Sequence, residues 1–206
     1  MVNPSPRTPV VGRLRFAHQL QGVPESLDSW RVTTDDSTVA NSLHRVLGGT
    51  APRPWPGPSQ DTLEVLTAAS ELNVIITSSM SFQTRFFRKN TDPDYTSTGD
   101  ELILPDSSRV PDPDRELSLL QRRRRARDTG ERPVTSLYCQ LAAAPDLGTL
   151  LFRSTSWDLA ERLRRADIPQ RLEAAGRDVP ATLRISKTPT GRATLSQATA
   201  HLLLND

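Results

Sequence analysis

The sequence predicts an α+β fold with a mainly antiparallel sheet and two principal helices. Segments of alternating apolar and polar residues come in adjacent pairs, as antiparallel strands do. Only two segments, at about residues 37–47 and 156–166, have a strong helical period. The chain of 206 residues also contains 17 prolines, which break helices and favour short elements joined by turns.

The chain is long enough to bury one core, so we expect residues 11–206 to form a single α+β domain. An Arg-rich central insertion is expected in it at about residues 80–135. Residues 1–10 show no hydrophobic period and are rich in Pro, Ser, Asn and Thr. We therefore expect them to form a disordered N-terminal lead-in.

Two strands and the first helix are predicted before residue 48. Residues 11–16 alternate apolar and basic side chains, and residues 27–34 form the second strand. Asp36 or Ser37 is expected to cap the helix over 37–47. Its apolar stripe consists of Val39, Leu43, Val46 and Leu47.

A proline-rich segment follows and is predicted to be an extended connector that cannot donate hydrogen bonds to a sheet. Its prolines are Pro52, Pro54, Pro56 and Pro58. Residues 62–67 alternate, and residues 72–77 contain a β-branched run. Because the connection between them is short, we expect these two strands to pair as a hairpin.

The rest of the chain is predicted to contain further strands around the second helix. Thr155 and Asp158 fit a reciprocal capping pattern at the start of that helix, and Pro169 opens a further helical turn. Residues 192–204 fit either a strand or a frayed helix. The other expected strands are 81–88, 101–104, 134–141, 149–153 and 179–186, of which 134–141 and 149–153 form a hairpin.

The composition argues against several classes of function. The 26 basic and 24 acidic residues leave a net charge of +2, so no strong overall field attracts the protein to nucleic acid or to a membrane. No window approaches the roughly 18 apolar residues of a membrane span, and residues 1–9 do not resemble a signal peptide. A lone cysteine and three histidines form no metal-ligand pattern. We therefore expect a cytoplasmic protein without cofactor or metal.

No group of residues has the pattern of a catalytic site. His18, His44 and His201 lack sequence partners that would orient a general base. Cys139 lies within an apolar strand, where a buried thiol is expected. We therefore expect no catalytic residues, and we interpret the chain as a protein that acts by binding.

The candidate partner-binding residues come from an arginine run and one tryptophan. The run is usually solvated surface, but it also fits contact with phosphates or with an acidic partner, since guanidinium groups pair bidentately with both. Trp55 lies between two prolines, where it is either a core anchor or exposed to a partner. The candidates are Arg122, Arg123, Arg124, Arg125, Arg127 and Trp55.

Two groups of short motifs lie near the two ends of the chain. The first comprises Gly12-Arg13-Leu14-Arg15, residues 27–33, Leu47-Gly48-Gly49-Thr50 and Pro54-Trp55. The second comprises residues 147–154, Ala160-Glu161-Arg162-Leu163 and residues 179–185. In this order they resemble the recombination directionality factors that actinobacterial phages pair with their large serine integrases.

The resemblance implies a non-enzymatic factor that binds a large serine integrase on its attachment-site DNA. Such a factor switches the integrase from integration to excision of a prophage, in the cytoplasm of the bacterial host. It needs no sequence-specific DNA binding of its own, no membrane and no small-molecule substrate. The alternative is a nucleic-acid-associated protein of a phage replication module that uses the Arg-rich segment on phosphates. A small enzyme of unknown type is a third possibility.

Overall fold

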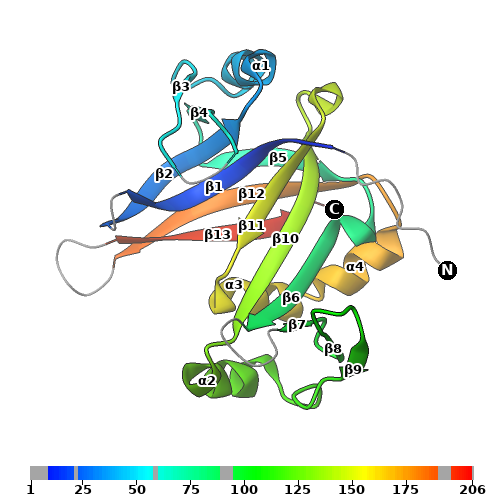
Figure 1. Cartoon of the computed structure of the whole chain (residues 1–206). Coiled ribbons are helices and arrows are strands. Elements are labelled where there is room, and N and C mark those ends of the chain that lie inside the picture. The colour runs from blue at the N-terminus through cyan, green and yellow to red at the C-terminus, as the bar shows by residue number, and fades with distance from the viewer. Residues whose placement is uncertain (1–8, 21–22, 58–59, 89–94, 190–195, 206) are drawn as a thin grey trace. The chain divides into compact units, whose positions relative to one another are not determined.

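The computed structural model describes residues 9–20, 23–57, 60–88, 95–189 and 196–205. Over these residues the chain has four α-helices and a mostly antiparallel sheet of 13 strands, so the predicted α+β fold is confirmed. The chain, whose elements are labelled in Figure 1, divides into two compact units. Unit 1 comprises residues 1–81, 138–152 and 172–206, and unit 2 comprises residues 82–137 and 153–171. The Arg-rich segment lies in unit 2, and most of the expected lead-in lies outside the described residues.

Unit 1 is built around long strands. Strand β1 (Val10–Leu20) pairs antiparallel with β2 (Val23–Thr34) and in parallel with β11 (Thr149–Ser154). Strand β11 is the neighbour of β10 (Arg132–Leu141), as the predicted hairpin requires. Both β10 and β11 have residues in each unit.

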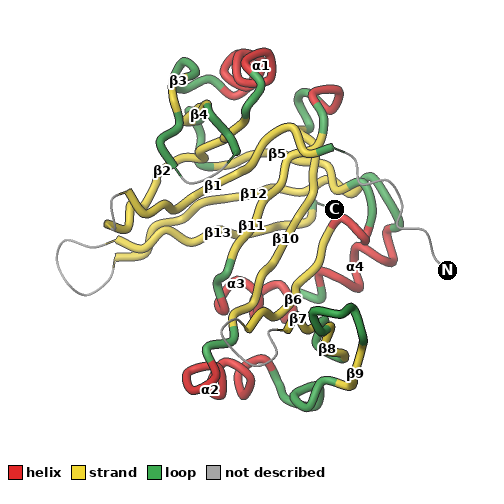
Figure 2. The backbone as a smooth tube through the Cα atoms, in the orientation of Figure 1, coloured by secondary structure: helices red, strands yellow, loops and turns green. Residues whose placement is uncertain are grey.

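The remaining strands of unit 1 extend this sheet in two directions (Figure 2). Strand β2 pairs with β4 (Leu63–Leu66), which pairs with the short β3 (Arg53–Pro54). Strand β5 (Glu71–Ile76) pairs with β10 and with β12 (Val179–Pro189), and β12 pairs with β13 (Ser196–Leu204). The C-terminal segment is therefore a strand and not a frayed helix.

Three aromatic rings form the centre of the unit 1 core. The fully buried ring of Trp30 meets Phe16 and Phe152 edge to face, at centroid distances of 6.2 Å and 5.7 Å. The Trp30 Nε1 donates a hydrogen bond of 3.0 Å to the carbonyl of Ser70. This bond satisfies the polar atom of a ring that otherwise contributes only apolar contacts.

Helix α1 (Ser37–Leu47) forms where the apolar stripe predicted it. Asp36, and not Ser37, caps the helix, because its carboxylate accepts hydrogen bonds from the backbone nitrogens of Thr38 and Val39. Val39, Ala40 and Leu43 are buried, whereas Val46 at the edge of the stripe is 36% exposed.

Unit 2 contains four shorter strands beside β10, in the order β10-β6-β7-β8-β9. They are β6 (Phe82–Arg88), β7 (Tyr95–Ser97), β8 (Glu101–Ile103) and β9 (Arg109–Pro111), each antiparallel to its neighbour. Its helices are α2 (Leu119–Thr129) and α3 (Trp157–Arg165), and α4 (Ile168–Ala175) begins in unit 2 and ends in unit 1.

The hairpin predicted for residues 62–67 and 72–77 is wrong. Strand β4 pairs with β2 and β3, whereas β5 pairs with β10 and β12. The connection is tied to β2 instead, because the Thr67 nitrogen donates to the Trp30 carbonyl and Trp30 Nε1 donates to Ser70. Long-range pairing with β2 thus replaces the local hairpin.

Two other local predictions are also corrected. The proline-rich connector does pair with the sheet, because Arg53 and Pro54 face β4 and the Trp55 nitrogen donates to the Thr62 carbonyl at 2.8 Å. Ser156, and not Thr155, caps α3, since its hydroxyl accepts from the Leu159 nitrogen.

We expect Leu43→Ala to reduce the free energy of unfolding by about 2 to 5 kcal/mol, because it leaves a cavity under α1. Val46→Ala in the same helix is the matched control, and its cost should be below about 1 kcal/mol because the side chain is partly exposed. Chemical denaturation measures both. Equal losses for the two variants would contradict the packing of α1.

A second prediction concerns two glycines with the same left-handed conformation. Gly49 (φ 85°) has the Leu66 carbonyl oxygen 1.9 Å from the position of an added Cβ, whereas Gly176 (φ 82°) has nothing within 4 Å. Alanine at either position has the strain of a left-handed backbone conformation. The difference between the two losses of stability therefore measures the clash of the added Cβ at position 49 with the Leu66 carbonyl. We expect Gly49→Ala to cost about 1 to 3 kcal/mol more than Gly176→Ala in thermal unfolding. An equal loss of stability in the two variants would mean that the backbone around Gly49 moves to accommodate the added Cβ without a further energetic cost.

Candidate functional site

The arginine run lies on α2, a helix that the sequence did not predict. Ser118 and Gln121 form a capping box at its start, and Gly130 ends it in the left-handed conformation. The apolar period is weak because arginines occupy almost every face, and only Arg122 and Ala126 are buried. The helix is thus fixed by its caps and by ion pairs instead of an apolar stripe.

Arg122 points into unit 2 and is only 3% exposed. Its Nε and Nη2 donate to the two carboxylate oxygens of Glu131, each at 2.7 Å, and Nη2 also donates to Asp112 at 2.7 Å. Its guanidinium lies 3.9 Å from the centroid of the Phe86 ring. Burial by itself lowers the pKa of Arg122, but the hydrogen bonds to Glu131 and Asp112 outweigh it and raise the pKa.

Asp112 is held as a carboxylate by several donors. Burial by itself raises the pKa of Asp112. Hydrogen bonds from the Ser97 hydroxyl, the Asp114 backbone nitrogen and Arg122 lower it by more than burial raises it, so the pKa of Asp112 lies below its ordinary value. The buried cation therefore has two anionic partners and a ring face. This arrangement differs from the solvated surface that the run predicted.

The neighbouring arginines point to the flanks of α2. Arg123 Nη1 donates to Asp158 and Glu161 of α3, at 2.6 Å and 3.4 Å. Arg125 Nη1 donates to Asp114 at 2.5 Å. These ion pairs join α2 to α3 and to the segment before α2.

Two arginines of the run face solvent. Arg124 and Arg127 are exposed, and within the described part of the chain neither forms a salt bridge. Because they are three positions apart, they share one face of the helix. Of the five arginines predicted to meet a partner, these two are free to do so.

Trp55 belongs to unit 1, whereas the arginine run belongs to unit 2. It is 7% exposed, and the guanidiniums of Arg15 and Arg31 lie 5.4 Å and 4.9 Å from its ring centroid. Of the two interpretations left open for it, the structure supports the core anchor.

Sequence reasoning missed a groove between α2 and α3, which is formed by two hollows. The first has a volume of about 580 Å³ and lies between β6, α2 and α3; Phe82, Thr84, Leu163 and Gln170 are among its lining residues. The second has a volume of about 390 Å³ and is lined by Ser118, Leu119, Leu120, Glu161, Arg164 and Arg165. The two hollows share Leu119 and Arg164, and we call them together the α2–α3 groove.

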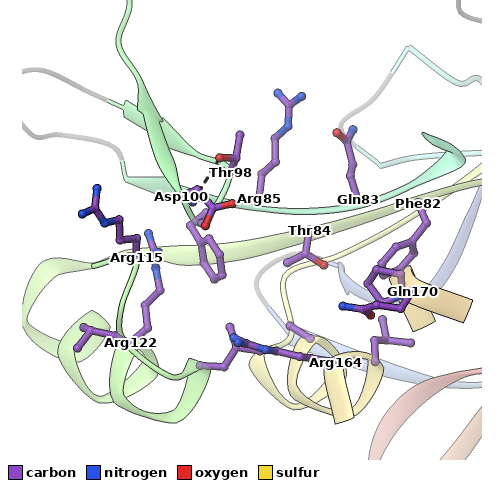
Figure 3. Close-up of a pocket in the computed structure, with 17 residues that line it drawn as sticks. Phe82, Gln83, Thr84, Arg85, Thr98, Asp100, Arg115, Arg122, Arg164 and Gln170 are labelled. Carbon is purple, nitrogen blue, oxygen red and sulfur yellow. Dashed lines mark hydrogen bonds between the residues drawn. The ribbon is translucent and has the colours of Figure 1, made fainter. Parts of the chain in front are cut away.

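Figure 3 shows how side chains of β6 alternate around the first hollow. Phe82 and Thr84 point to the side where Arg164 and Gln170 lie, and Gln83 and Arg85 point to the opposite side. The sequence predicted a strand at β6 and a helix at α3, but it predicted neither α2 nor the packing of these three elements against one another. The groove therefore depends on long-range packing that no local motif signals.

Two of the residues considered for catalysis, Cys139 and His201, lie in structural settings. Burial raises the pKa of Cys139 to about 12, so its thiol stays protonated near neutral pH. His201 Nε2 lies 2.7 Å from the Ser186 hydroxyl, and the side chain of His18 lies outside the described residues. Where the structure is described, no group of three or more His, Cys, Asp or Glu side chains is placed to hold a metal ion. Among the helices described, none has the length and apolarity needed to cross a membrane.

Comparison with known proteins gives one family match. A family model described as Gp3-like, recombination directionality factor-like, matches residues 11–200. No solved structure matches the chain. The match includes both motif groups and all of unit 2.

We expect Arg122→Met to cost about 3 to 5 kcal/mol of unfolding free energy, because it leaves two buried carboxylates without a cation. Arg124→Met is the control and should change stability by less than about 0.5 kcal/mol. The folded pKa of Asp112 is lowered, so its contribution to stability is present above the ordinary carboxyl pKa and is lost as the pH falls. The difference between wild type and Arg122→Met should therefore shrink below about pH 4. A difference that is constant with pH would contradict the ion-pair assignment.

Proposed function

The chain belongs to the recombination directionality factor-like family, and we propose that it binds a large serine integrase on its attachment sites and switches the integrase from integration to excision of a prophage. The observation that carries the proposal is the family match over residues 11–200, which covers nearly the whole chain. The site of action is the cytoplasm of the bacterial host, where integrase and DNA meet. The protein acts by binding and catalyses no step itself.

The energy that such a switch needs is modest. Moving a two-state equilibrium from 1:99 to 99:1 takes about 5.5 kcal/mol of differential binding, which a protein interface of standard size supplies. The factor must contact the excision-competent integrase better than the integration-competent one, since equal affinity shifts nothing. Within the run, the exposed Arg124 and Arg127 are the residues able to meet the integrase.

The alternative, a replication-module protein that binds phosphates through the arginine run, has less support. Three of the five arginines pair with acidic residues of the same chain. Two free arginines neutralise about two phosphates, which predicts a shallow logarithmic salt slope of roughly −2 for duplex DNA. Strong, steeply salt-dependent binding to bare DNA would favour this alternative over the integrase factor.

We expect the protein, added to its cognate serine integrase, to permit recombination between the hybrid left and right prophage ends and to inhibit the reaction between phage and bacterial sites. The double substitution Arg124→Ser with Arg127→Ser should weaken its binding to integrase on DNA while the fold is kept. Arg177→Ser is a matched control, because Arg177 is also exposed. An in vitro recombination assay and a gel supershift measure these effects.

Two results would count against the proposal in different ways. If the wild-type protein does not alter the direction of recombination by the integrase, the proposed function is wrong. If the double variant performs as well as wild type, the arginine face is solvated surface and the contact lies elsewhere. Replacing Arg122 in such a test would confuse binding with unfolding, because that side chain is buried.

A further inference from the structure

We propose that the α2–α3 groove binds a segment of the integrase in which a carboxylate lies beside an apolar side chain, and that Arg164 is the partner of that carboxylate. This inference rests on the proposed function and names the surface and the chemistry through which it operates. It involves residues of unit 2 alone.

The second hollow is mainly apolar, whereas polar and apolar groups share the walls of the first. Phe82, Ala160 and Leu163 line the first hollow, and Leu119 separates it from the second. Leu120, at the second hollow, is 49% exposed, although it is a large apolar residue in the first turn of α2. A mainly apolar hollow next to a mixed one favours a ligand that places an apolar side chain beside a polar or charged group.

Arg164 stands where the two hollows meet. It is exposed, and it forms no salt bridge with any described residue. Arg165 lies 3.7 Å from Glu161, Arg122 is paired with Asp112 and Glu131, and Arg115 is paired with Glu116. Arg85, which also lines the first hollow, points to the opposite side of β6 from Arg164 (Figure 3). A guanidinium beside apolar surface is well suited to a bidentate carboxylate, because water competes less there.

The groove is held in shape before a partner arrives. Arg123 joins α2 to Asp158 and Glu161 of α3, and the capping box of Ser118 and Gln121 fixes the first turn of α2. A preformed groove lowers the entropy cost of binding, since few side chains must be ordered.

A protein segment fits these features better than nucleic acid does. Duplex DNA presents phosphates, but its backbone has no apolar side chains to enter the hollows. An amphipathic segment with a carboxylate on its apolar face satisfies both the hollows and Arg164. Charge complementarity thus selects an acidic segment of the integrase as the occupant.

The test measures the affinity of the full-length protein for the serine integrase encoded by the same genome, bound to its attachment-site DNA. Arg164→Glu and Leu120→Asp should each weaken binding roughly 10- to 100-fold, as expected for loss of a charge-assisted contact. Arg177→Glu is the charge-matched control and should bind as wild type does. Aspartate at position 120 suits the N-terminal turn of α2, and thermal unfolding verifies that each variant is folded.

A charge exchange identifies the occupant. Overlapping peptides that tile the integrase are tested for binding to the wild-type protein, and the binding peptide should contain an Asp or Glu close to an apolar residue. Replacing that acid by Lys should abolish binding to wild type and restore binding to Arg164→Glu. A merely structural role of Arg164 does not produce this reciprocal rescue.

Each other outcome is decisive as well. Wild-type affinity in both groove variants overturns the groove and leaves the proposed function intact. Failure of the unchanged protein to bind integrase overturns the proposed function and this assignment with it. A loss confined to binding of bare duplex DNA, or to self-association, assigns the groove to phosphates or to a second copy and overturns the integrase segment.

Discussion

Unit 2 depends on the burial of one guanidinium. Arg122 contacts Asp112 before α2, Glu131 directly before β10 and the ring of Phe86 on β6. Burying a cation costs several kcal/mol unless anionic partners surround it. The three segments must therefore pack around Arg122, because otherwise α2 would have to expose this side chain to solvent. The ion pairs thereby do in unit 2 what Trp30 and its aromatic neighbours do in unit 1.

The orientation of Arg122 also determines what the rest of the run does. With positions 122 and 126 buried, the helical period of 3.6 residues sends Arg123 and Arg125 to the two flanks and Arg124 and Arg127 outward. Identical residues in one short run thus take three roles: internal ion pair, link to a neighbouring segment, and free surface charge. The positive charge of the run, read from the sequence alone, therefore does not indicate which of its arginines contact a partner.

This explains which features the sequence could predict. Helix α1, its cap and strands such as β2 and β6 follow from local period and capping chemistry, which act within a few residues. The pairing of β4 with β2 instead of β5, the helix over the arginines and the groove beside Arg164 depend on partners distant in sequence. Residues such as Arg164 were not predicted as a site, because their significance lies in the hollows around them and in the absence of an acidic partner among the described residues.

The proposed switch and the proposed groove meet in one physical requirement. A factor that redirects an integrase must distinguish two arrangements of the same protein, so its binding surface must resist adapting to both. A groove held by Arg123 and by the capping box of α2 has that resistance, whereas freely rotating surface arginines adapt readily. Discrimination should therefore reside in the fit of apolar side chains to the groove with the charge at Arg164. The exposed Arg124 and Arg127 should act mainly on the rate of encounter, because charges at the edge of an interface steer association more than they fix its final geometry.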